Sequence, residues 1–431
     1  MNADELFGFS QTLYPILRSI TGRGVRESLA LIRDNIPITI HSVPTGTQVL
    51  DWAVPEEWSF DRATIRHAST GELLLDSADN HLSALNYTGP VKQRVTREEL
   101  NQHLHTLPEN PDAIPYRTSY YNRTWGFCAR HSDTLTWGDG PFDVQIDAHH
   151  FDGELNYGEL VIPGDNCAEI IISTHICHPA LANDNVSGMV LTTALAQHIA
   201  RSKPYYTWRF LFVPGTIGAI TWLAQNRASL DNIIGGLVLT GLGDRSPFTY
   251  KKTPDGNQWI DFVMGDLLTG ENANTSQSAT DARLVDFDPY GYDERQYCSP
   301  GFRLPMGRFT RAVHGTLAQY HTSDDNLDFI TPETLFESLE FLTAFAARTN
   351  SERFYCNQAP TGEPQLGKRG LYGHVGASPD PDGFRTALLW LLNACDGQQS
   401  LTQIQHRTAS DPTLLTQALN ALLHAGLLKE R

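Results

Sequence analysis

The sequence lacks the features that direct a chain to a membrane or to an oxidising compartment. Its 431 residues contain no run of about 18 apolar residues, and its N-terminal segment carries acids where a secretory signal needs a basic start and an apolar block. Its six cysteines are scattered without a CxxC pair, so we expect reduced thiols and no structural disulfide. These absences predict a cytoplasmic protein that does not associate with membranes.

Basic residues are also scarce. The chain has 32 Lys and Arg against 49 Asp and Glu, which gives a formal net charge of −17 and a pI near 5.3. Such a charge opposes attraction to phosphate backbones and to anionic lipid. Nucleic acid is therefore excluded as an expected partner, whereas nothing in the composition excludes a homo-oligomer.

The length exceeds one ordinary core, and the residue patterns divide the chain. Strand and helix patterns alternate over 1–47 and 148–350, which predicts an α/β domain with a mostly parallel sheet sandwiched by helices. Residues 48–147 are rich in short strand-like pieces, aromatics and turns, so we expect a β-rich insert domain there. Residues 351–383 are expected to be a linker.

Residues 384–431 show three helical patterns with a helix-turn-helix rhythm, which predicts a winged-helix-like module. DNA binding is the usual function of such a module, but this one holds few basic residues within an acidic chain. We therefore expect it to serve packing or oligomerisation.

One segment joins an apolar strand to side chains that bind metals. Ile170, Ile171 and Ile172 form a β-branched run typical of a central strand, and His175, Cys177, His178 and Asp184 follow it. Helical spacing begins after Ser187. Since sites in open α/β sheets lie at the carboxyl ends of strands, and since imidazole with carboxylate suits zinc, this segment predicts a Zn²⁺ site.

A second segment, YHTSDDNLDFI, places His321 before a run of acids and a helix expected to start at Thr331 and Pro332. Taken alone, His321 is as well explained as a solvated loop histidine. Together with the first segment it supplies another imidazole for a site that needs about three protein ligands and an open position. We expect the metal ligands to come from His175, His178, Asp184 and His321, with the choice between the first two histidines left open.

These residues resemble the motifs of zinc aminopeptidases related to leucyl aminopeptidase and glutamate carboxypeptidase. NDNVSG is similar to the loop whose acid bridges two zinc ions in that family, and YHTSDD is similar to its late histidine motif. The resemblance implies that Asp184 and His321 bind zinc. A bacterial group of aminopeptidase-like proteins with a β-rich insert and a C-terminal winged helix resembles nearly the whole chain, through phrases that include VLDWAVPEEW, IPYRTSYYNRTWGFC, STHICHPALANDN, DERQYCSPGF and PQLGKRGLY.

The chain departs from that family where its catalytic acids stand. The resemblance implies a Glu-Glu pair after the next strand, but the sequence there has Pro214, Gly215 and Thr216. A further family acid would fall near Thr240, which leaves Asp244 as the nearest carboxylate. A single zinc ion is therefore the more economical expectation than two.

Two neighbouring acids are candidates for the missing function. Asp293 and Glu294 precede His321 in a segment that lines the pocket in the related enzymes, and Glu294 is the candidate acid/base or extra ligand. The alternative is that one of them pairs with Arg295 to hold a loop. Cys177 beside His178 is a further candidate, as a nucleophile, but no ordered Cys-His-acid set accompanies it.

Cations that could receive a substrate carboxylate or phosphate are few. Arg295, Lys368 and Arg369 are expected to bind substrate, and Tyr320 is expected to contact it beside His321. The alternative for the basic residues is ordinary pairing between domains.

The sequence therefore predicts a zinc-dependent, aminopeptidase-like hydrolase that cleaves an amide bond in a small peptide or an aminoacylated metabolite. The main alternative is a degenerate relative that binds a ligand or partner without turnover, because Gly215 replaces the usual base. A transferase of the glutaminyl cyclase kind depends on an acid at the same position and is weakened for the same reason.

Overall fold

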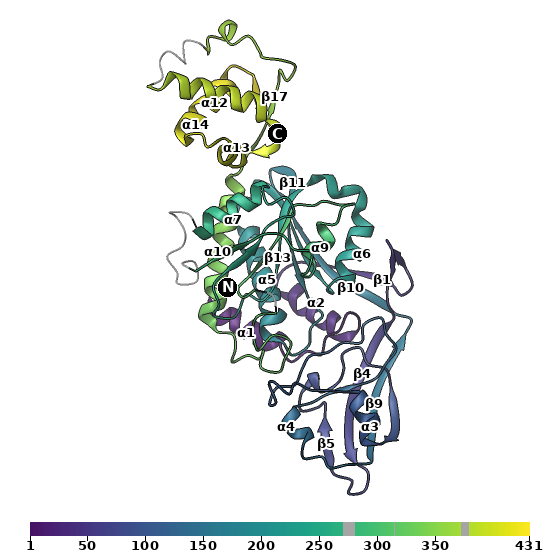
Figure 1. The fold of residues 1–431 in the computed structure, drawn as a ribbon. Coiled ribbons are helices and arrows are strands. Elements are labelled where there is room, and N and C mark those ends of the chain that lie inside the picture. The colour runs from purple at the N-terminus through teal and green to yellow at the C-terminus, as the bar shows by residue number, and fades with distance from the viewer. Residues whose placement is uncertain (270–280, 314, 372–378) are drawn as a thin grey trace.

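The computed structural model describes residues 1–269, 281–313, 315–371 and 379–431 (Figure 1). Three parts follow one another in space: the β-rich insert, a central α/β domain, and a C-terminal module at the far end from the insert. The α-helices of these ranges are α1 (Ala3–Leu13), α2 (Arg23–Asn35), α3 (Arg97–Gln102), α4 (His131–Thr134), α5 (Gly188–Arg201), α6 (Ile217–Asn226), α7 (Trp259–Thr269), α9 (Glu294–Tyr297), α10 (Pro332–Ser351), α12 (Pro381–Ala394), α13 (Leu401–Thr408) and α14 (Pro412–His424).

An eight-stranded sheet forms the centre of the α/β domain, in the order β1-β10-β12-β11-β13-β16-β14-β15. Its strands are β1 (Thr39–Pro44), β10 (Glu154–Ile162), β11 (Asn166–His175), β12 (Tyr206–Val213), β13 (Ile233–Leu239), β14 (Thr249–Lys251), β15 (Arg283–Val285) and β16 (Met306–Thr310). Parallel pairing joins β12, β11, β13 and β16, and also β14 with β15, but the pairs β1–β10, β10–β12 and β14–β16 are antiparallel. The sheet is therefore mixed, and the expectation of a mostly parallel sheet needs this correction, because strands added at both edges do not come from βαβ crossovers.

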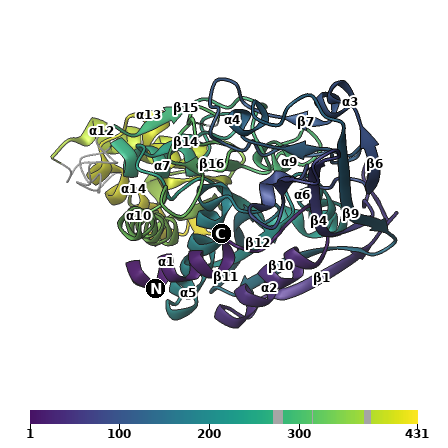
Figure 2. The same cartoon turned by 90° about the horizontal axis from the view of Figure 1, so that it is seen from below.

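Strand β11 lies in the middle of the sheet because both of its faces are apolar. Ile170 and Ile172 pack in a core cluster with α1, α5 and α10, while Ile171 packs in the opposite cluster with α6. Figure 2 shows α1, α5 and α10 together at one side of the molecule. This two-sided burial, which follows from the period of two along a strand, fixes the strand whose end carries His175.

The insert has its own four-stranded sheet, in the order β5-β4-β9-β6, formed by β4 (Glu57–His67), β5 (Leu73–Asp76), β6 (Val91–Val95) and β9 (Phe142–Phe151). Four short strands form two further two-stranded sheets: β2 (Gln48–Val49) with β3 (Trp52–Ala53), and β7 (Leu104–His105) with β8 (Phe127–Cys128). The insert is joined to the loop of His321 by backbone hydrogen bonds. The amide of Tyr116 donates to the carbonyl of His321 at 2.7 Å, and the amide of Ser323 donates to the carbonyl of Ile114 at 2.8 Å.

The C-terminal module packs α12, α13 and α14 with a three-stranded sheet in the order β18-β17-β19. The strands are β17 (Phe354–Asn357), β18 (Asp396–Ser400) and β19 (Leu428–Glu430). Strand β17 lies well before residue 384, so the module begins in the region expected to be a linker. Helix α13 contacts the α/β domain, where the Gln403 side chain donates to the carbonyl of Asn257 at 2.8 Å.

Helix α10 begins as its sequence predicts. The hydroxyl of Thr331 accepts a hydrogen bond from the amide of Thr334, and Pro332 occupies the first turn, where its missing N–H leaves no gap in the hydrogen bonding. Across the described ranges, no helix combines the length and apolar composition needed to cross a lipid bilayer.

Candidate metal centre

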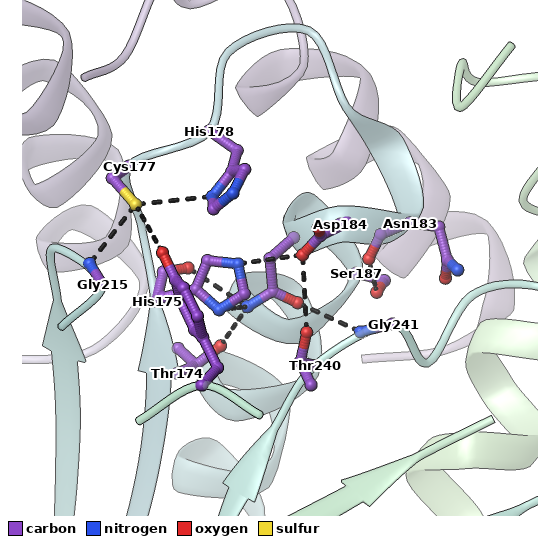
Figure 3. Close-up of polar contacts among 12 residues, drawn as sticks. Thr174, His175, Cys177, His178, Asn183, Asp184, Ser187, Gly215, Thr240 and Gly241 are labelled. Carbon is purple, nitrogen blue, oxygen red and sulfur yellow. Dashed lines mark hydrogen bonds and ion pairs between the residues drawn. The ribbon is translucent and has the colours of Figure 1, made fainter. Parts of the chain in front are cut away.

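The loop that follows β11 folds back on the end of that strand (Figure 3). The Asn185 side-chain amide donates to the Thr174 hydroxyl at 2.7 Å and to the carbonyl of His175 at 3.1 Å. A Cβ on residue 188 would overlap the side chains of Asn185 and Thr174, so only glycine allows α5 to start this close to the strand. The final Gly of the NDNVSG motif thus has a packing reason.

Asp184 lies between two imidazoles. Its Oδ1 is 2.9 Å from Nε2 of His175, and its Oδ2 is 3.1 Å from Nε2 of His321. Burial favours the neutral acid, but the charges and hydrogen bonds of His178, His175 and His321 outweigh it and hold the pKa of Asp184 well below its usual value. The group is therefore a carboxylate, the form that binds metals.

His178 completes the group. One ligand atom each of His175, His178 and Asp184 lies within 4.8 Å of the others, and all three residues are buried. The ring of His178 lies 5.4 Å from that of His321 between centroids. Burial, together with the neighbouring histidines, lowers the pKa of His178 well below its usual value although Asp184 opposes the shift, so its imidazole is neutral, the form that binds metals.

The spacing fits a zinc ion. Two ligands at the usual distances from zinc and at a tetrahedral angle lie about 3.3 Å apart, close to the separations between Asp184 and its two imidazoles. The structure therefore brings His175, His178, Asp184 and His321 together, and metal binding by these four residues stays a prediction. The sequence left open whether His175 or His178 is the ligand, and both of them lie in this group.

Two anchors of this group were not anticipated from the sequence. The side-chain oxygens of Asp325 accept hydrogen bonds from the amides of Asn183 at 2.6 Å and Asp184 at 2.9 Å, and so tie the first segment to the second. The buried Arg18, on the N-terminal segment, donates from Nε to the carbonyl of His178 at 2.9 Å. The sequence could not indicate these roles. Asp325 stands in a run of acidic residues, each of which could equally have been exposed to solvent, and Arg18 lies 160 residues from its partner His178.

Tyr292 occupies the space beside Gly215. A Cβ on residue 215 would overlap the Tyr292 hydroxyl, which is hydrogen bonded to Sγ of Cys177 at 3.3 Å. The Tyr292 ring lies 4.5 Å from that of His175 between centroids. The sequence indicates that position 215 has lost the family's acid. In the structure, the phenol of Tyr292, from another segment, occupies the space that a side chain at position 215 would need.

Cys177 is unsuited to be a nucleophile. Burial raises the pKa of its thiol to about 12, even though the Tyr292 hydroxyl and the amide of Gly215 favour the thiolate. Because the thiolate is the reactive form, this cysteine is inert at neutral pH.

Glu294 lies in a buried ion cluster. Its Oε1 is 2.5 Å from Nζ of Lys251 and 3.5 Å from a guanidinium nitrogen of Arg308. Burial raises the pKa of Glu294, but Arg308 and Lys251 outweigh it and lower the pKa overall. These contacts do not support the expected role of Glu294 as acid/base, because two cations hold its carboxylate. The alternative expected from the sequence was an ion pair with Arg295, but the partners of Glu294 are Lys251 and Arg308.

Asp293 is fully buried beside the metal group. Its Oδ1 accepts from the amide of Thr216 at 2.6 Å, while its Oδ2 has no hydrogen-bond partner among the described residues. Burial raises its pKa to about 6, opposed by the positive field of His175 and the Thr216 amide. Asp293 is therefore the acid that the structure places nearest to the position of the missing family residue.

The residues expected to bind substrate lie in different parts of the structure. Arg295 and His321 line one cavity, and Tyr320 lines a second, smaller one beside Asp184 and stacks on the His321 ring at 3.9 Å. Lys368 and Arg369 instead form a 3₁₀ turn, Gly367–Arg369, in the C-terminal module, and line neither cavity. The structure does not bring these two residues to the metal group, and substrate binding by them stays a prediction.

The fold is shared with solved structures of low sequence identity. A zinc aminopeptidase from Bacillus subtilis aligns with 81% of this chain and 95% of its own at 12% identity and a TM-score of 0.57. A peptidase M28 precursor from Shewanella amazonensis aligns over the same shares at 12% identity and a TM-score of 0.55. At such low identity these likenesses show the fold, which is that of the aminopeptidase-like α/β proteins.

The chain belongs to the family described as Domain of unknown function (DUF4910), whose model matches residues 7–351, and a winged helix-turn-helix model matches residues 353–430. A Clostridium acetobutylicum protein, provisionally described as a polysaccharide biosynthesis protein with an aminopeptidase-like domain, is 40% identical over 425 residues, which cover 99% of this chain and 96% of that protein. A crystal structure from the same organism, provisionally described as a peptidase, is 38% identical with a TM-score of 0.80 and covers 100% and 96% of the two chains. The aminopeptidase-like domain and the C-terminal winged helix are thereby confirmed.

Proposed function

We propose that this protein is a zinc-dependent hydrolase that cleaves an amide bond in a small substrate, such as a small peptide or an aminoacylated metabolite. The observation that carries the proposal is the group of His175, His178, Asp184 and His321 at the carboxyl end of the sheet strands. Zinc, when bound there, supplies a Lewis acid and lowers the pKa of a water molecule. The zinc aminopeptidase from Bacillus subtilis that shares the fold supports the choice of metal.

The residues around the group serve binding and orientation. Asp184 presents one oxygen to each of two imidazoles, while Asp325 and Arg18 hold the backbone on either side. Hydrolysis would add the water oxygen to the amide carbon, break the carbon–nitrogen bond and transfer a proton to the leaving amine. The wall of the larger cavity next to His178 and His321 contains no Asp or Glu among the described residues.

A role as a binding protein without turnover is the second candidate. It is favoured by that acid-free wall and by Tyr292, whose hydroxyl occupies the space beside Gly215. A catalytic version requires a group that accepts a proton from the water, and the usual carboxylate for this purpose is absent from position 215.

Metal content and turnover distinguish the two candidates. Protein purified without chelators is expected to hold about one zinc per chain by elemental analysis, because one ion satisfies the ligand set. Release of product from a panel of aminoacyl amides, dipeptides and N-acyl amino acids would support the hydrolase. Zinc with no turnover on the panel would favour the binding role, and the absence of any bound metal after incubation with zinc would contradict the site itself.

Asp293→Asn tests the buried acid. We assign Asp293 a positioning role, because it is buried behind Thr216 and acts on the site through the field at His175. Removing its charge is expected to lower kcat or zinc affinity by about 10–100-fold while KM stays unchanged. Steady-state kinetics and chelator competition measure these quantities. Asp286→Asn, at an exposed position of the same segment, is the control; equal kcat and zinc affinity in both variants would contradict the assignment.

A further inference from the structure

A cavity of about 540 Å³ opens beside His178 and His321, between the insert and the α/β domain. The insert contributes an aromatic wall of Trp52, Tyr116, Tyr120 and Tyr121, and the α/β domain contributes Tyr292. The Tyr116 ring lies 5.0 Å from the ring of His178 and 5.1 Å from that of His321, between centroids. A molecule in this cavity would therefore contact the aromatic wall and the metal group together.

The charge of this cavity differs from that of the protein as a whole. Its lining includes two cations, Arg117 from the insert and Arg295 from α9, but no acid among the described residues. Neither arginine forms an ion pair with any acid in the described part of the chain, although acids outnumber basic residues 49 to 32. By contrast, Arg303, eight residues beyond Arg295, is paired with Asp255 at 3.6 Å and does not line the cavity.

This arrangement disfavours a free N-terminal amine and favours an anion. A peptide's α-ammonium group needs a carboxylate nearby, and two guanidinium groups in the same cavity repel it. A guanidinium presents a planar fork of donors that matches a carboxylate or a phosphate. Aromatic side chains supply a flat surface for a cyclic body attached to the anion.

We propose that Arg117 and Arg295 bind the anionic group, carboxylate or phosphate, of a small molecule whose body packs on the aromatic wall. Assigning this molecule as the substrate rests on the proposed hydrolase function, and it makes the cleaved compound an anionic amide instead of a peptide with a free N-terminus. The binding itself does not depend on turnover.

Matched probes test the charge preference without an enzyme assay. Titration calorimetry on the full chain would compare N-acetyl-L-tyrosine, which is anionic, with the neutral N-acetyl-L-tyrosinamide and the cationic L-tyrosinamide. The anionic probe is expected to bind at least about tenfold more tightly than the neutral one, which is the value of about one charge-assisted hydrogen bond, and the cationic probe most weakly. Phenyl phosphate binding more tightly than N-acetyl-L-tyrosine would identify the anion as phosphate, and the reverse order as carboxylate.

Two further comparisons separate the arginines from other causes. Titrations with zinc-loaded and chelator-treated protein exclude binding of the anion by the metal alone, since the preference is expected in both. Arg295→Gln and Arg117→Gln are each expected to reduce the anionic-to-neutral affinity ratio by about tenfold, whereas Arg303→Gln is expected to leave it unchanged.

Equal affinity for the three probes, tighter binding of L-tyrosinamide, or a ratio unaffected by both arginine substitutions would overturn the proposal. Anion preference with no turnover of any amide would retain the binding site and reject the hydrolase. Turnover of aminoacyl amides without anion preference would do the opposite.

Discussion

Asp184→Asn is expected to lower the zinc affinity by at least about 100-fold, more than the loss typical of a residue that only orients a ligand. The substitution keeps the size of the side chain and removes its charge. Asp184 is the residue that faces both His175 and His321, and those imidazoles with His178 hold its pKa well below the usual value. An amide in its place offers one neutral oxygen and turns a donor toward one of the imidazoles.

The measurement is competition with a chromophoric chelator at pH 7, with Asp324→Asn as the control. Asp324 lies in the same segment as His321 but accepts a hydrogen bond from Asn110 at 3.1 Å, outside the metal group. The control is expected to keep the wild-type affinity. Equal affinity of the two variants would remove Asp184 from the ligand set.

Glu294→Gln is expected to destabilise the fold by about 3–5 kcal/mol, because it leaves Lys251 and Arg308 buried without a counter-charge. The Glu294 side chain is 1% exposed, and those of both cations are 4% exposed. The chain offers a matched control in the adjacent pair, Lys252 with Asp286, whose acid is 91% exposed. Asp286→Asn is therefore expected to change the unfolding free energy by less than about 1 kcal/mol.

Chemical denaturation at pH 7 measures both changes in unfolding free energy. Repeating it at lower pH tests whether the contribution of Glu294 falls in the expected direction. The folded-state pKa of Glu294 is lower than its unfolded value, so its contribution is fully present above the unfolded pKa and is lost as the pH falls through the folded one. The difference between wild type and Glu294→Gln is expected to narrow below about pH 4.5. A stable Glu294→Gln variant that loses turnover would instead restore Glu294 as the acid/base.

The metal segment shows how far local sequence reaches. The run Ile170–Ile172 is apolar on both faces, so a central strand is its natural structure, and the polar residues that follow must then lie at the end of that strand. The same reasoning located His321 before a capped helix. Local patterns could not show that the sheet is mixed, because the sequence of a short strand such as β1, at one edge, or β14, next to the other edge, carries no local mark of its direction.

Glu294 and Gly215 show where local reasoning fails. The sequence favoured Glu294 as an acid/base because of its position along the chain, but its partners Lys251 and Arg308 come from β14 and β16, which meet only in the folded sheet. The vacancy at Gly215 could be read in the sequence, whereas the Tyr292 hydroxyl that fills it could not.

The sequence by itself determined the aminopeptidase-like α/β domain, the C-terminal winged helix, and the residue types at the candidate metal group, because periodicity, motifs and charge are properties of neighbouring residues. Only the tertiary structure decided how Asp184 is shared between two imidazoles, which acids are neutralised by buried cations, and which cavity cations have no ion pair with the acids that the structure describes. These outcomes depend on distances between side chains that local patterns do not relate, such as Asp184 and His321, which are 137 residues apart, and burial gives those distances their energetic weight.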